Sequence, residues 1–204
     1  MVKVLIITGY GVNCEAESEY AWKLVGAKPS LVHLNDLLKN PTQILNYDAM
    51  MFIGGFSYGD HMSSGHVFAQ RIKINMKDVF LEYIKEGKLI LGICNGFQVM
   101  TKIGILPGLE NEYFKQKVSL IQNDCGFFQN LWVNIKINKQ SRYQNLLNEQ
   151  KKGPIVGWYF PQVLQEYDQN SQRKQMETLP NITNVCLSGH VDIASVIVGT
   201  PDLL

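Results

Sequence analysis

The residue with the clearest chemical potential is Cys94, which stands between two glycines after an apolar run. Residues 89–91 are apolar enough for a strand buried on both faces, and the pattern from Phe97 onward predicts a helix. A side chain at such a corner projects away from the backbone, and Gly92 and Gly96 leave room for the sharply turned chain. The helix N-terminus behind the thiol favours thiolate over thiol. The pattern therefore predicts a cysteine nucleophile.

A glycine- and serine-rich segment at 54–65 is a second candidate part of the site. A glycine pair after a buried strand lets backbone N–H groups face a neighbouring site. Together with the N–H of Asn95, such a pair would supply two donors to an oxyanion, usually the largest contribution in acyl transfer. A simple tight turn explains Gly54 and Gly55 equally well. Gln98, one turn into the predicted helix, either reaches back over the site or is an exposed helix residue.

A cysteine nucleophile needs a base that a third group orients. His190 and Asp192 are candidates, because alternate residues of a strand place their side chains on one face. A surface loop is the competing interpretation, since Ser188 and Gly189 precede them. The residues alone favour the loop.

The elements that must position these residues alternate along the first half of the chain. Strands are expected at 4–8, 30–34, 49–53 and 89–91, helices at 14–25 and 67–85, and short helical turns at 36–40 and 41–45. This rhythm predicts an α/β fold with a doubly wound, mostly parallel open sheet. Ligands of such sheets bind beyond the carboxyl ends of the strands, where the loops at 9–13 and 54–65 meet the Cys94 corner.

The second half of the chain has a different pattern. Strands are expected at 118–121, 131–137, 163–167, 185–187 and 193–198, as antiparallel hairpins that extend the same sheet. No repeat or low-complexity linker interrupts the chain. A single domain over residues 1–204 is therefore expected.

Composition narrows the function classes. The chain has 204 residues, 46% of them apolar, and a net charge of +1, which argues against a polyanion-binding surface. No apolar stretch could cross a bilayer, and the run at 1–7 is too short for a signal peptide. We expect a cytoplasmic protein that binds neither nucleic acid nor membrane. The four cysteines and the histidines lack metal-site spacing, and three of the cysteines are expected to be small buried hydrophobes.

Three segments, at 9–15, 54–61 and 92–98, together resemble the class I glutamine amidotransferase family. More narrowly, they resemble its glutaminase subunits of phosphoribosylformylglycinamidine synthase, and residues 119–126 extend the likeness. The resemblance is close over residues 1–137 and weak afterwards. After about residue 137 the domain is therefore expected to be truncated or degenerate.

The resemblance implies that the chain hydrolyses glutamine and supplies ammonia for de novo purine (IMP) biosynthesis. Cys94 would attack the side-chain amide, and the oxyanion would be held by backbone N–H groups of Gly55, Phe56 and Asn95. Glutamine binding would involve Gln98, Ser119 and Asn123. The ammonia would pass to the large synthase subunit, with or without a small bridging subunit. ATP and Mg²⁺ are expected on that partner, and this chain is expected to hold no cofactor or metal.

The family's Pro-His-Pro-Glu segment, which supplies the base and its orienting acid, is absent from the sequence. Either His190 and Asp192 form a divergent version, or residues 192–204 resemble the hairpin just before the catalytic histidine and the chain stops short of it. The second interpretation fits the local pattern better. A non-catalytic docking subunit of the same complex is therefore an alternative. A related cysteine hydrolase is another, although such enzymes place histidine where Asn95 stands.

Overall fold

The computed structural model describes residues 1–106, 108 and 111–120, together with the backbone of six short strands within residues 131–198. The described helices and helical turns are α1 (Glu15–Leu24), α2 (Leu34–Lys39), η1 (Pro41–Asn46), η2 (Ser57–Asp60), α3 (His66–Asn75), α4 (Lys77–Lys85) and α5 (Asn95–Ile103). The described strands are β1 (Lys3–Thr8), β2 (Lys28–His33), β3 (Ala49–Phe52), β4 (Leu89–Ile93), β5 (Val118–Leu120), β6 (Leu131–Asn134), β7 (Val156–Tyr159), β8 (Leu164–Tyr167), β9 (Arg173–Gln175), β10 (Asn184–Val185) and β11 (Ser195–Val198).

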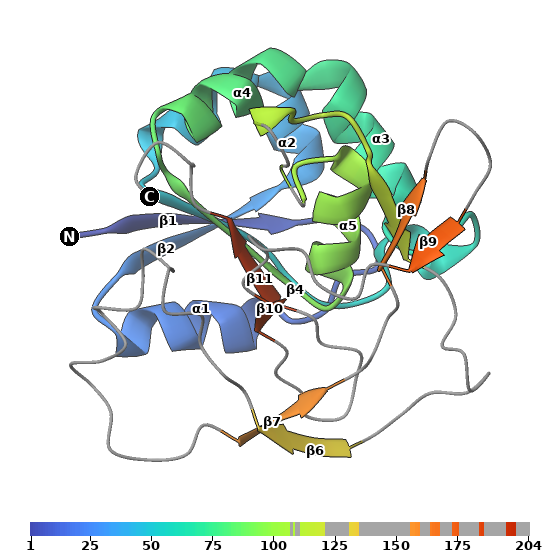
Figure 1. The fold of residues 1–204 in the computed structure, drawn as a ribbon. Coiled ribbons are helices and arrows are strands. Elements are labelled where there is room, and N and C mark those ends of the chain that lie inside the picture. The colour runs from blue at the N-terminus through green and yellow to red at the C-terminus, as the bar shows by residue number, and fades with distance from the viewer. Residues whose placement is uncertain are drawn as a thin grey trace.

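The main sheet has a parallel part made of β4, β3, β1 and β2, in that spatial order (Figure 1). Beside β4 lies β11 in the antiparallel direction, with Ile197 opposite Leu91, and β10 follows at the edge. This arrangement confirms the predicted open, mostly parallel sheet with an antiparallel extension.

The other strands of the second half do not join this sheet. The strand β8 pairs with β5 and β9 in one small antiparallel sheet, and β6 pairs with β7 in another. The expectation that the second-half hairpins all extend the main sheet was therefore wrong for these five strands. Alternating patterns identify a strand with one buried face, but they do not specify its partner.

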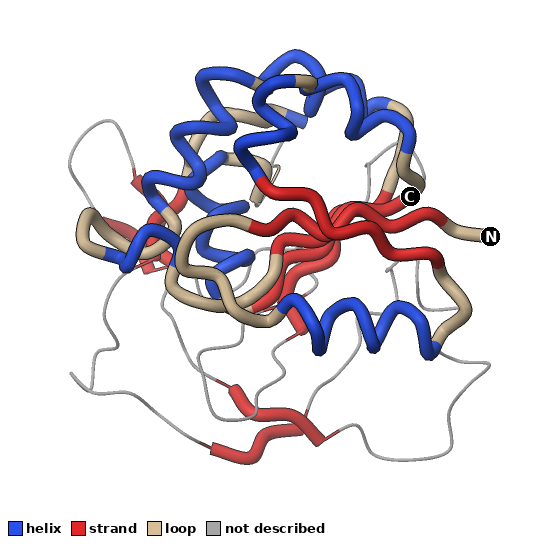
Figure 2. Tube along the Cα trace, turned by 180° about the vertical axis from the view of Figure 1, so that it is seen from behind, coloured by secondary structure: helices blue, strands red, loops and turns tan. Residues whose placement is uncertain are grey.

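Both faces of the central strands are covered, which explains their continuous apolar sequences. Along β1, Leu5 and Ile7 belong to the larger of two buried clusters, and Val4 and Ile6 belong to the smaller one. The helices α2 to α5 lie over the larger cluster, and α1 lies on the opposite face with Trp22 against the smaller one (Figure 2).

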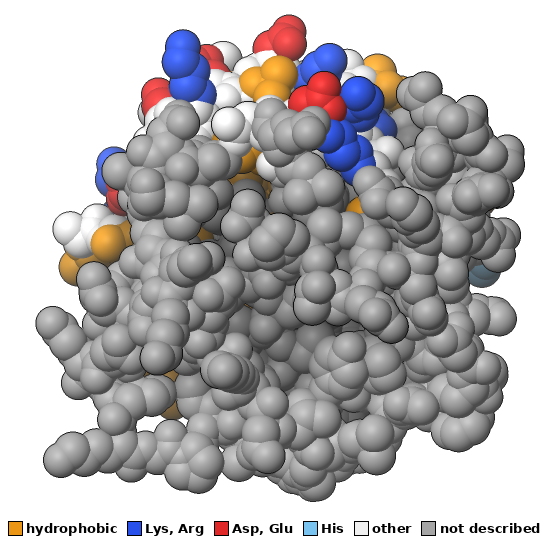
Figure 3. All heavy atoms as spheres, in the orientation of Figure 1, with side chains coloured by type: hydrophobic (Ala, Val, Ile, Leu, Met, Phe, Trp, Pro, Cys, Tyr) orange, Lys and Arg blue, Asp and Glu red, His pale blue; other side chains and the backbone are white. Residues whose placement is uncertain are grey.

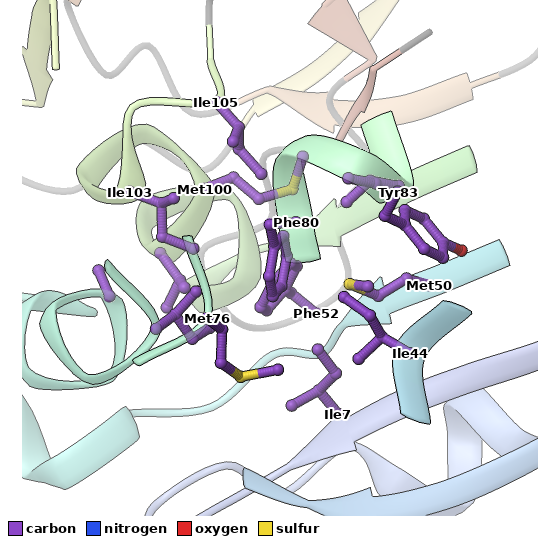
Figure 4. Packing of buried hydrophobic residues seen from close by; sticks show 14 of the residues in the cluster. Ile7, Ile44, Met50, Phe52, Met76, Phe80, Tyr83, Met100, Ile103 and Ile105 are labelled. Atoms are coloured by element: carbon purple, nitrogen blue, oxygen red, sulfur yellow. The ribbon is translucent and has the colours of Figure 1, made fainter. Parts of the chain in front are cut away.

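The larger cluster joins β3 to the helices above it. Phe52 at the end of β3 stacks on Phe80 with ring centroids 6.2 Å apart, and it meets Phe68 edge-on at 6.3 Å. Figure 4 shows Phe52 and Phe80 at the centre of this packing, with Met50 and Met100 around them. The carboxyl end of β3 is thus anchored to α3 and α4 through aromatic contacts.

The helix expected at 67–85 is two helices, α3 and α4, separated at Met76. Met76 has φ −132° and ψ 8°, and its buried side chain continues the apolar stripe from one helix to the next. Apolar periodicity therefore passes through the break without a signal. The Asn75 side-chain amide donates to the Arg71 carbonyl at 2.7 Å, which satisfies an acceptor at the end of α3.

On the face shown in Figure 3, described side chains of both charge signs lie close together over the helical layer. None of the described helices combines the length and apolar character needed to cross a bilayer.

Candidate active site

Cys94 occupies the corner between β4 and α5 in a backbone conformation that L-residues rarely adopt. Its φ of 54° and ψ of −115° are strained for a residue with a Cβ atom, and only 6% of the residue is exposed. Strain of this kind persists where the surrounding structure enforces it, and it is common at nucleophile corners. The predicted strand-to-helix corner is therefore present.

The two flanking glycines make this corner possible for different reasons. A Cβ at position 96 would lie 2.6 Å from the carbonyl carbon of Phe52, so α5 can approach β3 only with glycine there. A Cβ at position 92 would meet the Met100 side chain and lie 2.9 Å from the backbone of Gly96. Close backbone approach therefore explains both glycines, as the sequence predicted.

The loops after β1 and β3 are joined by hydrogen bonds beside this corner. The Asn13 N–H donates to the Gly54 carbonyl at 3.2 Å, and the Phe56 N–H donates to the Gly11 carbonyl at 2.7 Å. These two bonds enclose the antiparallel pair Val12 and Gly55, which do not bond to each other. Gly55 has φ 133°, and a Cβ there would lie 2.5 Å from the Val12 Cα.

This pairing engages one member of the expected oxyanion set. The N–H of Phe56 is engaged by Gly11, so the structure gives no support to Phe56 as an oxyanion donor. Among the described groups, no hydrogen bond engages the N–H of Gly55 or of Asn95. Asn95 begins α5, and the first N–H groups of a helix have no partner within it. Gly55 and Asn95 therefore remain as the candidate oxyanion donors.

The Asn95 side chain links the Gly54–Ser57 loop to α5. Its Oδ1 accepts the Ser57 N–H at 3.2 Å, and its Nδ2 donates to Oε1 of Gln98 at 3.0 Å. Asn95 is fully buried, and Gln98 is 9% exposed. Of the two interpretations of Gln98, the exposed helix residue is therefore wrong. The glutamine side chain lies within the buried network next to the nucleophile.

A second cysteine lies near the corner, which sequence reasoning missed. A Cβ placed on Gly54 would lie 3.2 Å from Cys14 Sγ and 3.5 Å from Cys94 Cβ, so the two cysteines face the same small residue. Cys14 is half-buried rather than buried, and its Sγ donates to Asn13 Oδ1 at 3.4 Å. Burial raises the pKa of the Cys14 thiol, and the neighbouring Glu17 and Glu15 raise it further.

The segment after Ser57 is held in an unusual shape by polar contacts. Tyr58, Gly59 and Asp60 all have positive φ. Arg71 of α3 donates to the Tyr58 hydroxyl and, at 2.7 Å, to Oδ1 of Asn35. No local signal in the sequence connects Arg71 with this loop, because the contact depends on how α3 packs.

The remaining predicted residues have different outcomes. Ser119 lies on β5 and accepts a hydrogen bond from Gln116 Nε2 at 3.2 Å, and β5 packs against α5. Asn123, His190 and Asp192 lie outside the described residues. Among the described residues, no group of three or more His, Cys, Asp or Glu side chains could hold a metal ion.

A cysteine at a strained strand-to-helix corner, with Gly55 and Asn95 as candidate donors on the adjoining elements, is a candidate site for attack on a carbonyl or carboxamide carbon. Residues 1–153 match the CobB/CobQ-like glutamine amidotransferase domain. The chain therefore belongs to the glutamine amidotransferase family.

Its relatives are more narrowly defined. The chain is 46% identical over 136 residues to phosphoribosylformylglycinamidine synthase subunit PurQ of Methanococcus maripaludis, covering 67% of this chain and 50% of that protein. It is 39% identical over 137 residues to the PurQ subunit of Dehalococcoides mccartyi, covering 67% of this chain and 53% of that protein. The chain spans about half the length of the curated relatives it matches.

A solved structure agrees with these relatives. The structure of PurLQS from Thermotoga maritima aligns with a TM-score of 0.61 and 27% identity, covering 95% of this chain and 87% of the matched chain. This chain therefore has a fold similar to that of the matched chain.

Proposed function

We propose that this chain is the glutaminase subunit of a phosphoribosylformylglycinamidine synthase and releases ammonia from glutamine for de novo purine biosynthesis. The observation that carries the proposal is the strained Cys94 corner, which lies against Gly54 of the loop after β3. The Gly55 and Asn95 N–H groups are proposed as the oxyanion donors. The similarity to PurQ subunits supports this choice of reaction among those open to a cysteine nucleophile.

The first chemical step uses groups that this chain supplies. The Cys94 thiolate attacks the side-chain carboxamide carbon of glutamine, and the carbonyl oxygen becomes an oxyanion that the Gly55 and Asn95 N–H groups hold. Collapse of this tetrahedral intermediate breaks the C–N bond. The leaving nitrogen gains a proton and departs as ammonia, and a thioester remains on Cys94.

The second step returns the enzyme to its starting state. Water attacks the thioester carbon, the same N–H groups hold the second oxyanion, and glutamate leaves as the Cys94 thiolate is restored. The proton transfers in both steps call for a base, and His190 with Asp192 is the pair proposed for it. Gln98, Ser119 and Asn123 are proposed to bind the glutamine substrate.

The ammonia is proposed to pass to a large synthase subunit, which would hold ATP and Mg²⁺. The similarity to the PurLQS structure supports a complex with PurL and with a small PurS subunit. No cofactor is proposed for this chain.

Glutamate release from glutamine tests the proposal. The full chain and its Cys94→Ala variant are each assayed alone and with a PurL-type large subunit, ATP and the formylglycinamide ribonucleotide. In the complex, we expect the native chain to release glutamate several powers of ten faster than the variant, since a nucleophile and its partners act as a unit. Equal rates would contradict the glutaminase. Synthesis that depends on free ammonia and not on glutamine would instead identify a non-catalytic docking subunit.

A further inference from the structure

The Asn95 side chain makes two hydrogen bonds within the site that a nucleophile corner does not itself need. Its carboxamide is fully buried, and both ends of it are hydrogen-bonded to parts of the site that lie on different elements. One end contacts the loop that carries Gly55, and the other contacts Gln98 on α5. Burying a carboxamide is costly unless each end is paired, so this geometry is well defined.

The direction of these hydrogen bonds is fixed by one group. A backbone N–H can only donate, so the Ser57 N–H requires an acceptor and turns Oδ1 of Asn95 toward itself. The Nδ2 of Asn95 must then point the other way and donate. Gln98 receives that bond on Oε1, so its own NH₂ group is the end that does not face the Asn95 amide. Among the described residues, no hydrogen bond engages that NH₂ group.

We propose that the Asn95 carboxamide is a positioning residue, which turns the NH₂ group of Gln98 toward the bound substrate. Gln98 then recognises an oxygen atom of glutamine as a donor and cannot offer an acceptor. The proposal rests on the proposed function, because it assumes that glutamine binds beside Cys94. The proposal explains why the Gln98 side-chain amide, which could bind a ligand in either of two orientations, is held in one of them.

A purely structural role for Asn95 makes a different prediction. If Asn95 only joined the loop to α5, an aspartate there would keep the bond from Ser57 and would matter through stability alone. If Asn95 sets the polarity of Gln98, the aspartate carboxylate forces Gln98 to donate back to it and to turn Oε1 toward the substrate. The donor would then be replaced by an acceptor, which repels a substrate oxygen.

The test compares two reagents that label Cys94. The diazoketone 6-diazo-5-oxo-L-norleucine mimics glutamine and needs the substrate site, whereas iodoacetamide needs only the thiol. Labelling of Cys94 in the full chain, alone and with a PurL-type subunit, is followed by mass spectrometry. The added carboxylate next to Cys94 slows iodoacetamide labelling to the extent that it disfavours the thiolate. We expect Asn95→Asp to slow diazoketone labelling about tenfold more than it slows iodoacetamide labelling, as expected for a lost hydrogen bond to a polar substrate group.

Two further readouts exclude a merely structural effect. The diazoketone deficit of Asn95→Asp, divided by its iodoacetamide deficit at the same pH, should shrink as the pH falls, because a protonated aspartate can again donate to Gln98 Oε1. In a Gln98→Leu background, Asn95→Asp should cost less than about threefold, because residues that act through one another are non-additive. Asn46→Asp, the same change on an exposed residue, is the matched control.

The outcomes separate the two proposals. If native chain reacts with iodoacetamide at Cys94 but not with the diazoketone, the proposed function fails. If native chain reacts with both and Asn95→Asp reacts with the diazoketone at the native rate, the positioning role is overturned. Gln98→Glu, which removes the donor directly, should lose the same labelling if Asn95→Asp does not fold. A native rate for that variant overturns the proposal as well.

Discussion

Gly96 and Phe52 are in backbone contact: a Cβ at position 96 would lie 2.6 Å from the Phe52 carbonyl carbon and 2.8 Å from its Cβ. This contact sets how closely α5 approaches the end of β3, and therefore where the first turn of α5 lies relative to the loop after β3. Since Asn95 and Gly55 are the candidate oxyanion donors and lie on these two elements, the spacing of the donors depends on this one glycine. The stability of the corner and its chemistry are thus linked.

A methyl group at position 96 should therefore disturb both the stability of the corner and the spacing of the candidate donors. Gly96→Ala is expected to lower the free energy of unfolding by about 3 kcal/mol, the upper range for overpacking against a rigid neighbour. Gly26→Ala is the comparison variant, because nothing lies within 4 Å of the added Cβ at Gly26, whereas its φ of 76°, unlike the helical backbone of Gly96, strains an alanine. That variant should cost about 1 kcal/mol from backbone strain alone. Urea denaturation measures both, and equal losses would show that the contact with Phe52 is not rigid.

Because Cys94 is strained, we expect glycine to be more stabilising than alanine at this position, the reverse of the usual order. Cys94→Ala and Cys94→Gly both remove the thiol, but only glycine relaxes at φ 54° and ψ −115°. The relieved strain, about 1–3 kcal/mol, exceeds the entropic cost of a glycine, about 0.5–1 kcal/mol. We expect denaturant titrations to give the glycine variant a free energy of unfolding about 1 kcal/mol larger than that of the alanine variant. An alanine variant of greater stability would mean that the corner is not strained.

Local signals were enough to predict the corner and the parallel strands. The apolar runs and the two glycines around Cys94 are close in sequence, and each of them limits the backbone by itself. The break at Met76 could not be predicted, because the apolar stripe continues through it. Helix boundaries of this kind depend on tertiary packing and cannot be read from the spacing of apolar residues.

The contacts around the corner depend on topology and could not be predicted from local patterns. Cys14 reaches Gly54 because β1 and β3 are parallel neighbours whose carboxyl ends meet at one edge. The family resemblance implied Phe56 as an oxyanion donor, but its N–H is used by Gly11 across the same edge. The side-chain bond from Asn95 to Gln98 follows helical spacing and was in principle predictable.

The thiol of Cys14 should react more slowly than an ordinary cysteine. Its pKa is raised by burial and then by Glu17 and Glu15, so the folded chain retains this proton to a higher pH than the unfolded chain. The associated stability is fully present below the unfolded pKa and is lost as the pH rises through the raised value. We expect iodoacetamide to alkylate native Cys14 more slowly than urea-unfolded Cys14 at about pH 8.5, close to the usual thiol pKa.

Mass spectrometry of the Cys14 peptide measures this difference, with the Cys94 peptide as an internal comparison. The double variant Glu15→Gln, Glu17→Gln should speed the native reaction by removing two nearby negative charges, and the unfolded rate should change less. A native rate equal to the unfolded rate would show that Cys14 is not sheltered.

The loop after Ser57 should depend on Arg71. The guanidinium bonds to both the Tyr58 hydroxyl and Asn35, and it lies 5.9 Å from the centre of the Tyr58 ring. Arg71→Ala is expected to lower the free energy of unfolding by about 1–2 kcal/mol, since two polar partners lose their bond. Arg71→Lys should recover only part of this loss. One ammonium can replace Nη1, which donates both bonds, but it does not reproduce the planar guanidinium near the Tyr58 ring.

Limited proteolysis distinguishes a local effect of Arg71 from a global one. The left-handed backbone at Tyr58, Gly59 and Asp60 keeps its own backbone bonds, such as Tyr58 N–H to the Tyr10 carbonyl, but it loses the side-chain bond from Arg71. Arg71→Ala should therefore speed cleavage within residues 58–63 more than cleavage elsewhere. Lys77→Ala, an exposed cation at the start of α4, should leave this cleavage unchanged. If the two variants are cut alike, the contacts to Tyr58 and Asn35 do not hold the loop. Its shape would then come from the bonds between the Gly11 and Phe56 backbones instead.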